Sequence, residues 1–264
     1  MIIASGHAEP VNGPCPNCGT QLEGRYCSSC GQRAAGLRPT LHDLLHEALH
    51  EFSHVDGKIL RTVGLLLFRP GQLTLEFVQG KRARSVSPLR LYLLISVLFF
   101  GALAMMPSSR KLSLTVPATN VRLSQAADRI NRDPAILSHA FETAFPKAMF
   151  VLMPGFGLLV YAFYWPRERM YVPHFYFAVH FHAFAFAMFS LYAVMGAAHW
   201  RPLSLARLAL PLAPLPYLTI ALRKVYGGRR FMSVGKTIAI VSIYLVFILM
   251  TMAAIAYFTL LHYT

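Results

Sequence analysis

Four cysteines near the N-terminus have the spacing of a metal site. They form two Cys-x-x-Cys-Gly units, one ending at Gly19 and the other at Gly31. Each unit predicts a tight turn that points two sulfurs at one position, and four thiolates make a closed tetrahedral site suited to structural Zn²⁺. We therefore predict a zinc ribbon over residues 15–36 that binds one zinc ion through Cys15, Cys18, Cys27 and Cys30.

Three other interpretations of the cysteines compete with zinc: a redox pair, two disulfides, or an iron site. The first residues, Met1-Ile2-Ile3-Ala4, are too few for the apolar core of a secretory signal. We therefore expect the N-terminus in the cytosol, where thiols stay reduced and paired cysteines more often bind metal. A zinc ion with four protein ligands has no open position for water, which predicts a structural or partner-binding role.

A row of histidines follows the ribbon at four-residue steps. It contains two overlapping His-Glu-x-x-His strings, in which two histidines bind Zn²⁺ and the glutamate acts as general base in zinc proteases. The alternative is the polar shoulder of an amphipathic helix that begins near Thr40, because four-residue steps drift only about 40° each. A third ligand at a recognised distance is missing, so the metalloprotease is the less favoured alternative. Its site would be His46, Glu47, His50 and His54.

The composition predicts a membrane protein. Hydrophobic residues make up 55% of the 264 and charged residues 14%, whereas soluble domains carry about a quarter charged residues. Residues 1–87 hold seven of the 11 acids, and long apolar runs follow Ser87. The fold class we predict is therefore all-α, a polytopic membrane helix bundle of about five spans.

The predicted order of elements begins with a flexible tail at 1–14 and the ribbon at 15–36. Amphipathic juxtamembrane helices at 40–87 are too short and too polar to cross a bilayer, and they would lie on its surface or pack against the bundle. The transmembrane bundle fills 88–264. Its five runs of about 20 apolar residues lie near 89–106, 146–165, 174–196, 205–222 and 237–261.

The net charge of +14 is concentrated between the apolar runs. Basic residues there anchor helix ends and meet anionic lipids, so we expect the lipid bilayer as partner and no nucleic acid. Arg69, Lys81, Arg82 and Arg84 are candidates for head-group or anion binding. Ordinary anchoring at the inner face is the alternative reading of the same four residues.

Polar residues inside the apolar runs raise further alternatives. His180 and His182 either bind haem or relay protons, with His139 and His199 as possible partners, or they hydrogen bond to neighbouring helices. Pro211, Pro214 and Pro216 must interrupt the fourth run, either as kinks or as a broken helix that lines a substrate path.

An ordered set of short motifs runs from the ribbon to the first apolar run. It consists of the two cysteine units with Tyr26 and Gln32, then Thr40-Leu41, Arg61-Thr62, Leu66, Arg69-Pro70-Gly71, Gly80-Lys81-Arg82 and Pro88. This order resembles a bacterial membrane family catalogued as domain of unknown function 3667. The likeness covers residues 15 to about 100 and implies an inner-membrane protein with a cytosolic zinc ribbon, but no activity. His46 and His50 are outside the family pattern, and Val86 replaces a common aromatic.

The function that these features favour is non-enzymatic. We expect an integral inner-membrane protein with a cytoplasmic N-terminus and a periplasmic C-terminus. Its ribbon would dock a cytosolic protein partner or brace the spans, and its bundle would handle a lipid or a small solute.

Overall fold

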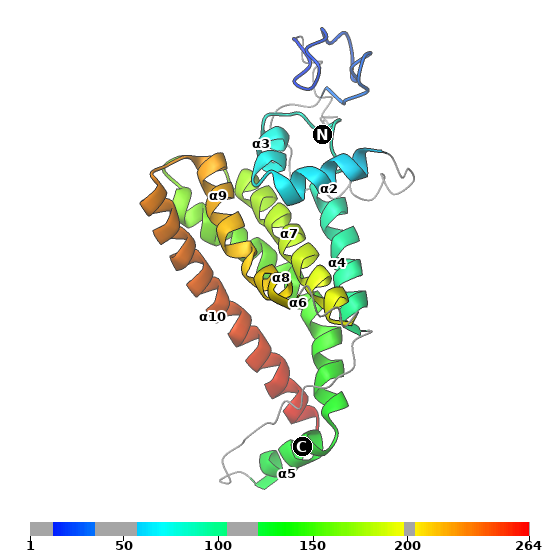
Figure 1. The fold of residues 1–264 in the computed structure, drawn as a ribbon, viewed down its shortest axis with the longest axis vertical. Coiled ribbons are helices and arrows are strands. Elements are labelled where there is room, and N and C mark those ends of the chain that lie inside the picture. Colours follow the sequence, from blue (N-terminus) through cyan, green and yellow to red (C-terminus); the bar gives the residue numbers. More distant parts are fainter. Residues whose placement is uncertain (1–12, 35–56, 105–120, 198–203, 264) are drawn as a thin grey trace, which may run out of the picture.

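The computed structural model describes residues 13–34, 57–104, 121–197 and 204–263. Across these residues the protein is helical and contains no β-strand (Figure 1). Two isolated bridges, Pro14 with Gln21 and Tyr26 with Arg33, pair extended residues in the cysteine segment. The all-α prediction is confirmed for the described part of the chain. Most of the predicted tail, the whole histidine row and His199 lie outside it.

Three helices are long and apolar enough to cross a membrane. They are α6 (Pro134–Tyr164), α7 (Tyr171–Ala197) and α10 (Arg230–His262). The 27 residues of α7 span about 40 Å at 1.5 Å per residue, more than the roughly 30 Å of a bilayer's hydrocarbon core. A fourth apolar helix, α4 (Pro88–Ala104), is shorter. These lengths and compositions indicate a membrane protein.

Five continuous spans are not shown, because the predicted run 205–222 is divided. It forms α8 (Ser204–Ala209), the 3₁₀ turn η2 (Leu210–Leu212) and α9 (Pro214–Tyr226). Proline lacks the N–H that a helix interior needs, so the closely spaced prolines end one helix and begin the next. Hydropathy alone therefore overestimates the length of this element.

The helix that contains the second predicted span is longer than that span. The helix α6 begins twelve positions earlier, at Pro134, and carries Pro146 and Pro154 in its interior. Proline is well suited to the first helical position, and Asp133 caps it by accepting a hydrogen bond from the Ala135 N–H at 3.1 Å. The preceding helix, α5 (Val121–Arg132), is separate.

The most enclosed helix is α7. In its apolar window 61% of residues are buried, against 17% for α10, which presents most of its surface to the surroundings. Contacts join α7 to α3, α4, α6 and α9, and Figure 1 shows it between α4 and α9. A helix that is apolar on all sides and buried by its neighbours forms the bundle core.

The two ends of the bundle carry different structures (Figure 1). The cysteine segment lies at one end with α2 (Lys58–Phe68) and α3 (Gln72–Val78), and α5 lies at the other end with the C-terminus. Both α2 and α3 pack against the bundle. The rings of Phe77 and Tyr176, on α3 and α7, are 4.2 Å apart. We call α2, α3 and the loop 79–87 the collar.

A second small core lies at the end opposite the collar. The buried face of α5, with Ala126, Ala127 and Ile130, packs against Leu137 of α6 and Leu260 of α10. The other face of α5 carries exposed Arg122, Asp128 and Arg129. This amphipathic pattern explains why a helix too polar to enter the bilayer is still ordered against the spans.

Candidate metal centre

The four cysteines meet at one point. Their Sγ atoms all lie within 4.8 Å of one another; Cys15 and Cys30 are 3.7 Å apart, and Cys18 and Cys27 are 3.4 Å apart. A tetrahedral zinc site with Zn–S bonds of about 2.3 Å has sulfur–sulfur edges of about 3.8 Å. All four cysteines are free thiols, so the donor set fits a metal ion held by four thiolates.

Two similar turns bring the sulfurs together. In the first turn the Gly19 N–H donates to the Cys15 carbonyl at 2.8 Å, and in the second the Gly31 N–H donates to the Cys27 carbonyl at 2.9 Å. Both glycines have positive φ, 83° and 70°, a conformation that other residues adopt only at a cost. Glycine at positions 19 and 31 therefore lets each turn close without backbone strain.

The thiols differ in their readiness to lose a proton. Hydrogen bonds from the Thr20 hydroxyl and backbone N–H to the thiolate lower the pKa of Cys18 to about 6. The backbone N–H groups of Cys30 and Ser29 favour the Cys27 thiolate, but burial and the neighbouring sulfurs outweigh them and raise its pKa to about 11. Cys18 is also exposed, whereas Cys27 is buried.

The cysteine segment docks onto the collar through Gln32, the residue after the second turn. Its Oε1 accepts hydrogen bonds from the backbone N–H groups of Arg82 and Ala83, both at 3.0 Å. Its Nε2 donates to the Gly80 carbonyl at 2.7 Å. One side chain thus satisfies three backbone groups of a loop 48 or more positions away, and the contact follows directly from the fold around Cys30.

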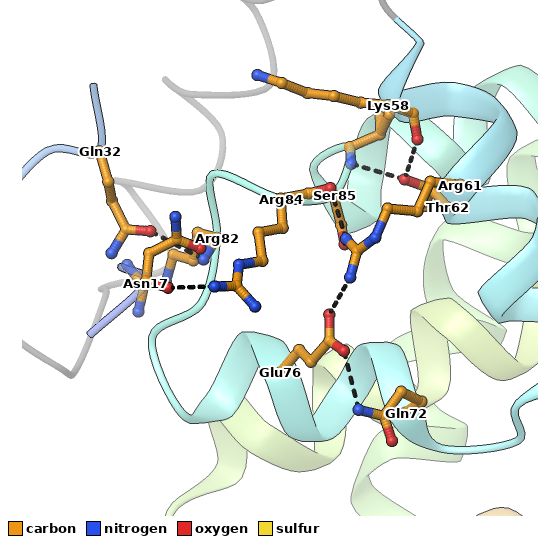
Figure 2. A network of polar contacts seen from close by, with 11 residues as sticks. Asn17, Gln32, Lys58, Arg61, Thr62, Gln72, Glu76, Arg82, Arg84 and Ser85 are labelled. Carbon is orange, nitrogen blue, oxygen red and sulfur yellow. Dashed lines mark hydrogen bonds and ion pairs between the residues drawn. The ribbon is translucent and has the colours of Figure 1, made fainter. Parts of the chain in front are cut away.

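A polar network extends this contact into α2 and α3 (Figure 2). The guanidinium of Arg84 donates to the Asn17 carbonyl at 2.9 Å, and that of Arg61 donates to the Arg84 carbonyl at 2.7 Å. Arg61 also pairs with Glu76 of α3 at 3.6 Å. The loop 79–87 is therefore held by the cysteine segment on one side and by the collar helices on the other.

Buried Thr62 joins α2 to the start of α4. Its hydroxyl donates to the Lys58 carbonyl at 2.6 Å and accepts the Val86 N–H at 3.1 Å. Neither Gln32 nor Thr62 was identified as a contact residue from the sequence, although both are among the family-like positions. Both contacts join segments 24 or more positions apart, so no local pattern in the sequence identified them.

The four predicted anion-binding residues occupy different surroundings. Arg84 contacts Asn17, and the Arg82 guanidinium lies 5.0 Å from the centre of the Phe77 ring. Lys81 is half-buried in the same loop, whereas Arg69 is exposed in the turn between α2 and α3. The structure therefore brings Lys81, Arg82 and Arg84 together and leaves Arg69 apart.

The histidines of α7 have hydrogen-bond partners, as the structural alternative predicted. His182 lies 2.8 Å from the Ala178 carbonyl through Nδ1 and 2.7 Å from the Tyr244 hydroxyl through Nε2. His180 Nδ1 lies 3.0 Å from the Thr74 hydroxyl of α3. His139 is exposed on α6. These contacts tie α7 to α10 and to the collar.

Two cations cap helix ends on the collar side, a role that the sequence did not reveal. Arg167 donates to the carbonyls of Tyr226 and Gly227 at 2.6 and 2.7 Å, at the end of α9. Lys236 donates to the Phe163 carbonyl at 2.6 Å, at the end of α6. Helix C-termini carry unpaired carbonyls and partial negative charge, so these cations stabilise both ends.

Comparison with known proteins supports the predicted resemblance over part of the chain. Residues 56–100 match the family model described as "Protein of unknown function (DUF3667)". This range holds α2, α3, the loop 79–87 and most of α4, but not the cysteine segment. Searches of curated proteins and of solved structures found no match.

Proposed function

We propose that this chain is a non-enzymatic membrane protein in which a structural Zn²⁺ folds the cysteine segment so that it braces the collar against the bundle. Four thiolates saturate the ion and leave no position for water, which favours a structural role. A segment of this size has too small an apolar core to fold alone, so metal binding would supply its folding free energy. The observation that carries the proposal is the three-fold contact of Gln32 with Gly80, Arg82 and Ala83.

The orientation proposed is collar side inward, in the inner membrane of a bacterium. A thiolate site is stable in the reducing cytosol. Basic residues gather at the collar end, as expected for a cytoplasmic face, and they include Arg167, Arg169, Arg223, Lys224, Arg229 and Arg230.

Metal analysis of the purified full-length protein tests the proposal. We expect one zinc per chain, lost in Cys15→Ser and kept in the control Ser28→Ala, which changes an exposed residue between two ligands. Removing the metal should expose the loop 79–87 to protease while the helices remain folded. The proposal is contradicted if the purified protein carries no tightly held metal. It is also contradicted if protease cuts the loop 79–87 at the same rate with and without the metal.

A further inference from the structure

The loop that receives Gln32 has the geometry of an anion-binding nest. Gly80 follows the end of α3 by two positions and has φ 80°. The Gly80 and Lys81 N–H groups close the helix by donating to the Phe77 and Glu76 carbonyls at 3.0 and 2.8 Å. The next two N–H groups point outward and converge on one oxygen. Successive backbone N–H groups arranged in this way form concave sites for anions.

The oxygen that now fills the nest belongs to a neutral group. Gln32 Oε1 is 3.0 Å from the N–H groups of both Arg82 and Ala83. The Arg82 N–H is shared, because it also lies 3.1 Å from the Gly80 carbonyl. The carboxamide fits this position because its Nε2 can donate to Gly80 at the same time. It supplies an acceptor but no negative charge.

The side chains around the nest are cationic. Lys81, Arg82 and Arg84 belong to the loop itself, and Arg61 of α2 reaches it through the Arg84 carbonyl. Among the described residues, Glu76 pairs with this group through Arg61. The Nε of Arg82 is buried and has no hydrogen-bond partner among the described residues. A phosphate oxygen in the nest would receive the two N–H groups and also neutralise the surrounding charge, which a carboxamide cannot do.

We propose that the loop Gly80–Arg84 is a binding site for a phosphate group, and that Gln32 occupies it as an intramolecular competitor while the cysteine segment is folded. The inference rests on the proposed function, because the metal-bound fold is what presents Gln32. Two contacts withdraw the loop from outside ligands: Gln32 fills the nest and Asn17 engages Arg84. Loss of the metal releases both. Phosphate of this kind is available from anionic lipid head groups and from free phosphate.

The test compares variants of the full-length protein in detergent, titrated with dihexanoyl phosphatidic acid. Gln32→Ala removes the competitor, and affinity should rise on the order of tenfold because the open nest becomes the main state. Gln32→Glu places a carboxylate in the nest and should bind the lipid more weakly than the unaltered protein. Gln21→Ala makes the same change at an exposed position of the cysteine segment and should leave affinity unchanged.

Two further arms identify the ligand source and the role of the metal. Inorganic phosphate that displaces the lipid supports a free-phosphate ligand, and failure to displace it supports a lipid head group. A chelator added to the unaltered protein should raise lipid affinity to the level of Gln32→Ala and should have little effect on that variant. If Gln32→Ala acted only by loosening the collar, Gln32→Glu would loosen it as well and would not weaken lipid binding. Weaker binding by Gln32→Glu therefore supports the competitor role.

Metal content is measured on every sample, so the two proposals fail separately. If the unaltered protein holds one zinc and Gln32→Ala binds phosphatidic acid no better, the nest is not a phosphate site and the structural zinc proposal stands. If the unaltered protein holds no metal, the proposed function is wrong. A double variant that carries both Gln32→Ala and Arg84→Gln should bind phosphatidic acid more weakly than Gln32→Ala alone. Equal affinity of these two variants would also contradict the inference.

Discussion

His182 of α7 and Tyr244 of α10 are joined by a hydrogen bond of 2.7 Å between Nε2 and the phenol oxygen. The other imidazole nitrogen, Nδ1, faces the Ala178 carbonyl and therefore carries the proton, so Tyr244 is the donor in the pair. This polar contact joins the exposed helix α10 to the core helix α7.

Tyr244→Phe should therefore destabilise the bundle. The substitution keeps the ring but leaves the His182 Nε2 acceptor without its donor, which costs about 0.5–2 kcal/mol in a membrane interior. Thermal unfolding in detergent would measure the loss. Tyr257→Phe is the matched control, because this tyrosine of α10 is 54% exposed. Equal stability of the two variants would show that the hydrogen bond between His182 and Tyr244 does not stabilise the packing of α10.

Thr62→Val should loosen the start of α4. The substitution keeps the shape of the side chain but removes the acceptor of the Val86 N–H, and a buried N–H without a partner costs about 1–3 kcal/mol. Thr251→Val is the control, since that hydroxyl makes the same bond to a carbonyl one turn earlier. Amide exchange at Val86 gives the readout, and faster exchange only in Thr62→Val is expected.

Arg167→Gln should fray the end of α9. The Arg167 guanidinium is the donor to the Tyr226 and Gly227 carbonyls, and an exposed cap of this kind contributes about 0.5–1 kcal/mol. Protease cleavage after Arg229 should become faster, whereas Arg169→Gln in the same turn should not change it. If both variants are cut at the rate of the unaltered protein, the contact is not a cap.

Metal affinity should fall as pH is lowered. Zinc binds thiolates, so each thiol that is protonated in the free protein must release a proton, and affinity changes about tenfold per proton for each pH unit. The Cys27 pKa of about 11 means that at least one proton is displaced throughout pH 6 to 9. The Cys18 pKa of about 6 adds a second pH-dependent step below that value.

Competition with a chromophoric chelator across this range gives the slope. Thr20→Val removes the hydroxyl that favours the Cys18 thiolate, so the additional loss of affinity should begin at higher pH in that variant. A slope that stays constant through pH 6 in the unaltered protein contradicts the assignment to Cys18.

The cysteine cluster was predictable because its ligands are local. Four sulfurs within 16 positions meet through two tight turns whatever the rest of the chain does. The apolar spans were predictable for a similar reason, since length and hydropathy identify α7 and α10 directly. The start of α10 was placed seven residues late, because its first turns carry Arg230 and Lys236 and only the tertiary structure shows that they remain helical.

The contacts that decide the site were not predictable, because they join distant segments. Gln32 meets Gly80 across 48 positions, and Thr74 meets His180 across 106. A buried polar side chain needs a hydrogen-bond partner, which the sequence predicts for His180. Only the packing of α3 against α7 shows that this partner is Thr74. An interruption of the run 205–222 was predicted from its prolines, which lack a backbone donor, but the run was still counted as one span. The sequence left open whether the prolines kink the helix or break it, and the structure shows separate elements.

The packing of α5 determines where the polypeptide can be shortened. Leu260 lies in the last turn of α10 and helps to cover Ile130, which is fully enclosed. Trimming the chain after Tyr257 would leave α10 at about 42 Å, still more than the roughly 30 Å of a bilayer's hydrocarbon core. It would also expose Ile130 at the end of the bundle opposite the collar (Figure 1). A fusion partner appended after Thr264 leaves Leu260 in contact with Ile130, whereas truncation after Tyr257 removes Leu260.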